Sequence, residues 1–151
     1  MSVNNLLSYF IIYSFLGWVL ESVYKTIVEK KLVNSGFLYG PICPIYGFGA
    51  LIMLIFLKSF SNNIALLFLI GFFILSIWEY IVGFLLEKIF KTKYWDYSNR
   101  KMNIKGRVCL TNSFFWGVLG VIFIMFIHPP VENVINMVPK EQLTYVNIIM
   151  F

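Results

Sequence analysis

The sequence predicts an all-α integral membrane protein with four transmembrane helices that form two parallel-repeat helical hairpins. Three observations lead to this fold class. The 151 residues are 60% hydrophobic and only 13% charged, whereas soluble domains are about a quarter charged. Four apolar stretches approach the length that crosses a bilayer. Finally, the two halves of the chain resemble each other. This composition excludes a disordered chain and a disulfide-rich scaffold.

The four spans are predicted at residues 6–24, 42–57, 64–86 and 108–127. A helix needs roughly 20 apolar residues to cross about 30 Å of hydrocarbon, and the first, third and fourth stretches meet this length. The second has 16 residues, so it spans only if the loop before it also lies at membrane depth. We expect residues 128–151 to form an interfacial tail or the start of a fifth helix that is truncated at the C-terminus.

The basic residues predict the orientation. Ten of the twelve lysines and arginines lie in the loops that follow the first and third spans, and two, Lys58 and Lys140, lie on the other side. Because basic loops stay in the cytoplasm, the N-terminus is expected outside. The net charge of +5 therefore reflects topology, and no nucleic acid partner is expected. Lysine outnumbers arginine, and Asn, Ile and Phe are abundant, which favours a bacterial plasma membrane protein from an AT-rich genome.

The two halves match when the chain is shifted by 66 residues. Residues 17–26 then lie over residues 83–92, and five of the ten positions are identical. Chance similarity of two apolar helices does not explain the matched Glu and Lys. We therefore divide the single membrane domain, 1–151, into repeat 1 (about 6–57), repeat 2 (about 64–127) and the tail. Parallel repeats would bring Glu21 and Glu87 together near the axis between them.

Glu79 is the polar residue that most needs an explanation. It lies seven residues before the end of the third span, roughly 10 Å deep. Because an ionised side chain at that depth is costly, Glu79 should face the bundle, together with Gly83, Leu86 and Glu87. Transport or proton handling and a structural interhelical hydrogen bond both remain open.

Glu21 and Glu87 each have a lysine four residues later, Lys25 and Lys91. This is the favourable order for a helical ion pair, so interfacial salt bridges are the alternative to a role in a pathway.

Two loops carry unusual sequences. Residues 34–49 are apolar but rich in Gly and Pro, which predicts either a broken start of the second span, with Pro41 as the first helical residue, or a tight turn. In the second loop, Asp96 and Ser98 suit a turn or cap, and Trp95 and Tyr97 suit the membrane interface. Its basic residues fit anionic lipid headgroups as an alternative use.

No nucleotide-binding, nucleophile–base or metal-ligand motif is present in the sequence, so no cofactor and no metal are expected. Cys43 and Cys109 would face a reducing compartment as free thiols. An ATP-driven function would need a separate ATPase subunit.

Two groups of residues resemble the signatures of the ABC-transporter type IV permease family (CmpB-like). The first group is Asn34, Gly36, Phe37, Leu38, Gly40, Pro41, Pro44, Ile45, Tyr46 and Gly47. The second is Glu79, Tyr80, Gly83, Leu86, Glu87, Trp95, Asp96, Tyr97, Ser98, Asn103, Gly106 and Arg107. A group of small animal transmembrane proteins of unknown function is similar around the second group. The resemblance runs from about Gly17 to Gly120, and Ser35 departs from it because the family usually has Arg there.

The resemblance implies a permease component, and we expect Glu79, Glu21 and Glu87 to line its polar site. Four helices enclose little space, so a homo-oligomer or another membrane subunit is expected in the lipid bilayer. The first alternative is a non-transporting sensor or scaffold that binds lipid or a cytoplasmic partner. The second is an intramembrane lipid-modifying enzyme that uses Glu79 and Asp96 as acid and base.

Overall fold

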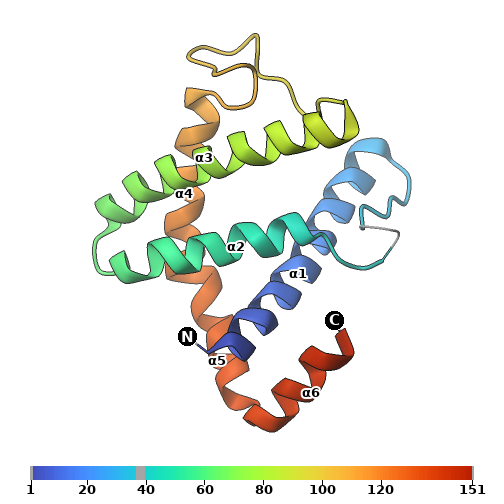
Figure 1. Cartoon of the computed structure of the whole chain (residues 1–151), viewed down its shortest axis with the longest axis vertical. Helices are drawn as coiled ribbons and strands as arrows, with labels where there is room; N and C mark the ends of the chain where they lie inside the picture. The colour runs from blue at the N-terminus through green and yellow to red at the C-terminus, as the bar shows by residue number, and fades with distance from the viewer. Residues whose placement is uncertain (1, 37–39, 151) are drawn as a thin grey trace. The chain divides into compact units, whose positions relative to one another are not determined.

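The computed structural model describes residues 2–36 and 40–150, and this part of the chain is helical (Figure 1). It contains no strand beyond an isolated antiparallel bridge between Ile104 and Val108. The elements, in chain order, are α1 (Val3–Glu29), α2 (Pro44–Leu57), the 3-10 helix η2 (Lys58–Phe60), α3 (Ile64–Phe90), α4 (Leu110–Ile122), the π-helix η3 (Phe123–Ile127), α5 (His128–Met137) and α6 (Lys140–Met150). The predicted all-α fold class is confirmed.

Three helices of the described chain are long and apolar enough to cross a bilayer: α1, α3, and the run Leu110–Met137 that α4, η3 and α5 form together. Their mean hydropathies are 1.6, 2.3 and 2.0. The shorter apolar helix Pro44–Phe60 comprises α2 and η2. The 14 residues of α2 extend about 21 Å at 1.5 Å per residue, less than the hydrocarbon thickness. A fourth span at α2 therefore stays a prediction.

The chain divides into two compact units, Met1–Leu51 with Pro130–Phe151, and Ile52–Pro129. Their boundaries fall inside α2 and α5, not at the ends of the predicted repeats. The ends of α1 and α3 also depart from the 66-residue spacing, since the N-caps Ser2 and Asn63 are 61 residues apart. As a result, Glu21 lies eight residues before the end of α1 and Glu87 three before the end of α3. The hairpin repeat stays a prediction.

In the second unit, α3 packs against α4 along a stripe of residues with four-residue spacing. Leu67, Gly71, Leu75 and Glu79 are the buried residues of α3. Gly71 and Gly117 let the two backbones approach closely, because a methyl group at Gly71 would lie 3.5 Å from Gly117 Cα. Beside them the hydroxyl of Ser76 donates to Ser113 Oγ at 2.6 Å. Glu79 thus continues the stripe that holds the two helices together.

The C-terminal segment differs from the expected tail. The helix that begins at Leu110 does not end at Ile127 but continues to Met137, through Pro129 and Pro130. A proline lacks an amide hydrogen and its ring displaces the carbonyl one turn before it, and the wider π-turn of η3 accommodates both effects. The sequence predicts an interfacial tail or a truncated fifth helix at residues 128–151, whereas the first ten of these residues extend the third long helix.

In the first unit, α6 packs on the N-terminal part of α1 through polar side chains. Asn4 Nδ2 donates to Thr144 Oγ1 at 2.9 Å, and Ser8 Oγ donates to Asn147 Oδ1 at 3.0 Å. The amide of Asn147 in turn donates to the carbonyl of Asn4 at 3.0 Å. These hydrogen bonds make α6 part of this unit's helical packing.

Candidate functional site

The carboxyl group of Glu79 is buried between α3 and the chain that follows it. Only 7% of the residue is exposed. Its Oε1 accepts a hydrogen bond from the hydroxyl of Tyr97 at 3.2 Å. Its Oε2 is buried and has no hydrogen-bond partner among the described residues. Since a buried carboxyl usually has partners for both oxygens, one half of this group is left open.

Two side chains of α4 lie beside the carboxyl group of Glu79. Asn112 and Trp116, one helical turn apart, lie within reach of the Glu79 carboxyl group as hydrogen-bond donors, although neither bond meets regular hydrogen-bond geometry. The indole Nε1 of Trp116 is itself buried without a hydrogen-bond partner in the described part of the chain. Neither residue is among those that the sequence predicts for the site. Their spacing of four within an apolar helix is the signal that could have identified them.

Tyr97 remains a hydrogen-bond donor to Glu79 over a wide pH range. Burial, and then the charge of Glu79, raise the pKa of the Tyr97 phenol to about 12. Its backbone is held as well, since Tyr97 N donates to the carbonyl of Gly106 at 2.8 Å. The loop therefore presents a neutral phenol to the carboxyl group in a defined position.

Asp96 organises the loop that carries Tyr97. Its Oδ1 accepts from the backbone N and the hydroxyl of Ser98, at 2.9 and 2.5 Å, and Oδ2 accepts from Lys93 at 3.3 Å. The hydrogen bond from the Ser98 hydroxyl is the main reason that the pKa of Asp96 is lowered. Asp96 is therefore ionised and engaged within its own loop, a geometry that does not favour its use as a catalytic acid.

Asn103 and Gly106 close the same loop. Asn103 Nδ2 donates to the carbonyls of Ser98 and Arg100, and its Oδ1 accepts from Gly106 N at 3.1 Å. Gly106 has φ +71°, and a Cβ there would collide with Asp96 and Ser98. A glycine is required on both counts.

Arg107 ties this loop to the end of α3. Its Nε and Nη2 donate to Glu87 Oε2 at 3.0 and 2.7 Å, and Nη1 donates to the Tyr80 hydroxyl at 3.3 Å. The guanidinium group also lies 5.3 and 5.4 Å from the ring centres of Tyr80 and Phe84. The pairing of Glu87 with Lys91 expected from the sequence is not found, because α3 ends at Phe90 and Lys91 turns away with a left-handed backbone.

Trp95 completes the arrangement around α3. Its Nε1 donates to the carbonyl of Arg107 at 2.9 Å. Its ring lies against Gly83, where a methyl group would come within 3.1 Å of Cζ2. The second group of sequence-predicted residues, from Glu79 to Arg107, is thus brought together at one end of the α3–α4 pair.

The first group of predicted residues lies in the other unit. Asn34 Oδ1 accepts from Trp18 Nε1 at 2.6 Å and from Gly36 N at 3.0 Å. The helix begins at Pro44, so the expectation that Pro41 is its first residue is wrong. Gly40 and Pro41 precede the helix, and Phe37 and Leu38 lie outside the described residues.

Glu21 lies on α1 in this first unit. It forms the expected ion pair with Lys25, at 2.8 Å. The phenol of Tyr46 faces the same carboxylate. The contacts beside it are tight: Gly17 lies against Tyr46, and Gly47 lies against α1 near Ser14. Because Glu21 belongs to one unit and Glu79 and Glu87 to the other, their convergence on one axis stays a prediction.

Cys43 and Cys109 are buried free thiols. The Sγ of Cys43 donates to the carbonyl of Ser35 at 3.1 Å. Among the described residues no group of three or more His, Cys, Asp or Glu side chains could hold a metal ion.

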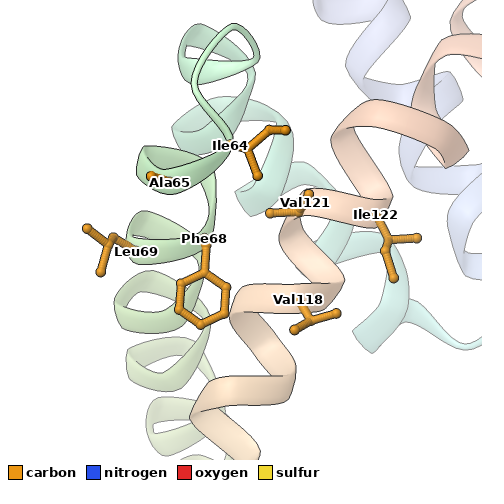
Figure 2. A pocket seen from close by; sticks show the side chains of 7 residues that line it. All are labelled: Ile64, Ala65, Phe68, Leu69, Val118, Val121 and Ile122. Carbon is orange, nitrogen blue, oxygen red and sulfur yellow. The ribbon is translucent and has the colours of Figure 1, made fainter.

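One groove of the described chain lies between α3 and α4, and another lies along α4. Figure 2 shows the larger, about 740 Å³, between side chains of α3 and α4. It is lined by Ile64, Ala65, Phe68, Leu69, Val118, Val121 and Ile122. Without any polar group, it suits acyl chains and not a polar solute. The second groove, about 390 Å³, includes Asn112 and Trp116 in its lining and so adjoins the neighbours of Glu79.

Comparison with known families gives one match. Residues 8–151 match the model of a family described as "Putative ABC-transporter type IV". The match includes both groups of residues discussed above. No curated protein and no solved structure matches the chain.

Proposed function

The chain belongs to the ABC-transporter type IV family, a family of transport-related membrane proteins, and we propose that it is a permease component that binds a proton or a cationic solute at Glu79. The observation that carries the proposal is the half-open carboxyl group of Glu79. Tyr97 donates to one oxygen, whereas no hydrogen bond of regular geometry reaches the other oxygen in the described chain.

The energetics support a ligand at this oxygen. An ionised side chain near the centre of a span costs about 2.5–3.5 kcal/mol on insertion scales. A hydrogen bond to a charged group returns about 1.5–3 kcal/mol at ordinary length, so the Tyr97 hydroxyl, 3.2 Å away, offsets only part of that cost. A proton or a cation on the open oxygen would remove the remaining penalty. Asn112 and Trp116 add polar groups at the same place, and both also line a groove along α4.

Glu21 and Glu87 have different parts in this proposal. Arg107 already neutralises Glu87, and Lys25 neutralises Glu21. We therefore assign the solute site to Glu79, and we assign Glu87 to holding the loop that carries Tyr97. The small size of the chain supports assembly with further copies or with another membrane subunit. ATP-driven transport would require a separate ATPase subunit.

Flux measurements in proteoliposomes test the proposal. Vesicles with the purified chain are loaded with pyranine for protons, or with ion-sensitive dyes for sodium and potassium, and an ethidium efflux assay represents organic cations. We expect at least one cation to move through the native protein and Glu79→Gln to abolish that movement. Gln keeps the shape and hydrogen bonding of Glu but cannot titrate.

Glu29→Gln is the matched control. Glu29 lies at the end of α1 with a partly exposed carboxylate that pairs with Lys31 at 3.0 Å. Its variant should transport as the native protein does. Cation flux through Glu79→Gln at the native rate would refute the proposal.

A sensor or scaffold remains the second candidate. The observation that favours it is the exposed basic surface of the loop between α3 and α4, whose lysines and Arg100 are all exposed. A lipid-binding role for this surface does not require transport.

A further inference from the structure

We propose that the loop between α3 and α4, residues 91–109, is a lipid-binding element that docks on anionic phospholipid headgroups and inserts Met102 and Ile104 into the bilayer interface. This inference goes beyond the proposed function and does not depend on Glu79. It rests on the charge, the exposed apolar side chains and the rigidity of the loop.

The loop carries a cluster of exposed positive charge. The exposed basic residues are Lys91, Lys93, Arg100, Lys101 and Lys105. The acid of the loop, Asp96, pairs with Lys93. In the described chain the other four have no ion-pair partner. Lysine is a compact point charge that binds phosphate well, so this surface complements an anionic headgroup layer.

Apolar side chains project from the same surface. Met102 is 74% exposed and Ile104 is 58% exposed. Met102 also has φ +52°, in the left-handed region that long side chains rarely adopt. Lys105 of the same loop has a similar backbone, with φ +53°, so both residues belong to tight turns of the loop. The Met102 side chain is mostly exposed and is therefore free to meet the bilayer.

The loop is already ordered before it meets a ligand. Asn103 bonds Ser98, Arg100 and Gly106, and Tyr97 bonds Gly106. Arg107 joins the loop to α3 through Glu87. A pre-formed surface loses little conformational entropy when it binds. The low entropic cost favours binding of the loop to lipid even where each contact is weak.

The bilayer is the partner that best fits this position and chemistry. The loop leaves α3 at Phe90 and enters α4 at Leu110, and both helices are apolar enough to cross a membrane. The loop therefore lies at the height of the headgroups. Protein–protein interfaces are depleted in lysine, whereas clustered lysines beside apolar residues are typical of membrane surfaces. The predicted cytoplasmic side faces the leaflet rich in anionic lipid.

An environment-sensitive fluorophore tests the inference in the full chain. We would attach NBD to Met102→Cys, with the buried Cys43 and Cys109 left in place, and reconstitute the protein in phosphatidylcholine or in an equal mixture with phosphatidylglycerol. We expect a blue-shifted emission, quenched by brominated acyl chains, in the mixture and a smaller shift in phosphatidylcholine. The same probe at Asn99→Cys, an exposed polar position of the loop, should report water in both.

Charge removal completes the test. Lys101→Gln should raise the amount of phosphatidylglycerol needed for half of the shift by roughly fivefold, since one basic residue near an anionic surface contributes about 1 kcal/mol. A triple variant, Arg100→Gln with Lys101→Gln and Lys105→Gln, should lose the dependence on phosphatidylglycerol. Lys31→Gln, an exposed lysine of the first unit, should change nothing.

Three results would overturn the inference. A water-like Met102 probe in both membranes would exclude insertion. A triple variant with the native dependence on phosphatidylglycerol would exclude recognition by these charges. A spectral shift caused by inorganic phosphate alone, in phosphatidylcholine, would indicate a site for free phosphate. Circular dichroism of each variant ensures that the helices remain formed, and the single Lys101→Gln variant supplies the answer if the triple variant does not fold.

Discussion

The hydrogen bond between Tyr97 and Glu79 joins the loop to the buried carboxyl group, so removing it should have a measurable and specific effect. Tyr97→Phe deletes the hydroxyl and keeps the ring. The oxygens are 3.2 Å apart, longer than the usual 2.7–2.8 Å between a hydroxyl and an oxygen acceptor. A neutral hydrogen bond contributes about 0.5–1.5 kcal/mol and one to a charged group about 1.5–3 kcal/mol. At this length we expect about 1 kcal/mol of the free energy of unfolding.

A double-mutant cycle separates this bond from the rest of the site. In a Glu79→Leu background Tyr97→Phe should cost close to nothing, because no acceptor remains. In a Glu79→Gln background the side-chain carbonyl still accepts, so a cost of about 1 kcal/mol should remain. Tyr94→Phe is the matched control, since Tyr94 lies in the same loop and is 61% exposed.

The assay is reversible unfolding by dodecyl sulfate in mixed micelles, followed by circular dichroism. Equal costs of Tyr97→Phe in the native and Glu79→Leu backgrounds would refute the bond and the placement of the loop over Glu79. If Tyr94→Phe lowers the free energy of unfolding as much as Tyr97→Phe does, the effect comes from removing any tyrosine hydroxyl of the loop and not from the bond to Glu79.

Three further predictions concern packing, titration and topology. Gly117→Ala should destabilise the chain by about 1–3 kcal/mol in the same unfolding assay, because its methyl group would lie 2.7 Å from a phenylalanine ring of α3. Gly71→Ala is the control and should be tolerated, because the neighbours of its methyl group would be no closer than 3.4 Å. In ultraviolet difference titrations of the native protein against Tyr97→Phe, the missing phenol should ionise near pH 12 and not near 10. Since only the folded state holds this proton above about pH 10, its contribution to stability should be lost as the pH rises towards 12. Cysteines at Asn62 and Asn99 should react with impermeant maleimide from opposite sides of the membrane, and reaction of both from one side would contradict the predicted orientation.

The apolar helices could be predicted from the sequence because their lengths and compositions obey the bilayer constraint directly. The burial of Glu79 followed from the same constraint, since an acid in an apolar span must avoid lipid. The end of the long helix at Met137 could not be predicted from the sequence. Whether Pro129 interrupts the helix depends on the π-turn before it. The backbone geometry around Pro129 decides whether the helix continues there, and the residue types nearby do not specify that geometry.

The contacts of the site were harder to predict than its members. Glu87 has a lysine at the favourable helical spacing, yet it binds Arg107, twenty residues away, because α3 ends before Lys91. Asn112 and Trp116 could not be predicted as members of the site. An Asn and a Trp within an apolar helix are common packing residues, and only the structure shows that they face the carboxyl group of Glu79. Pairing across a loop depends on tertiary structure, which one-helix rules do not describe.

Carbodiimide labelling tests the central claim most directly, namely that Glu79 exchanges a proton or cation within the membrane. Dicyclohexylcarbodiimide enters bilayers and reacts with protonated carboxyl groups, and peptide mass spectrometry identifies the modified residue. In proteoliposomes we predict labelling of Glu79 that falls as the pH rises and that slows when a transported cation is present, with no label at that position in Glu79→Gln. Labelling that is absent at every pH, or that responds neither to pH nor to any cation, would contradict the account.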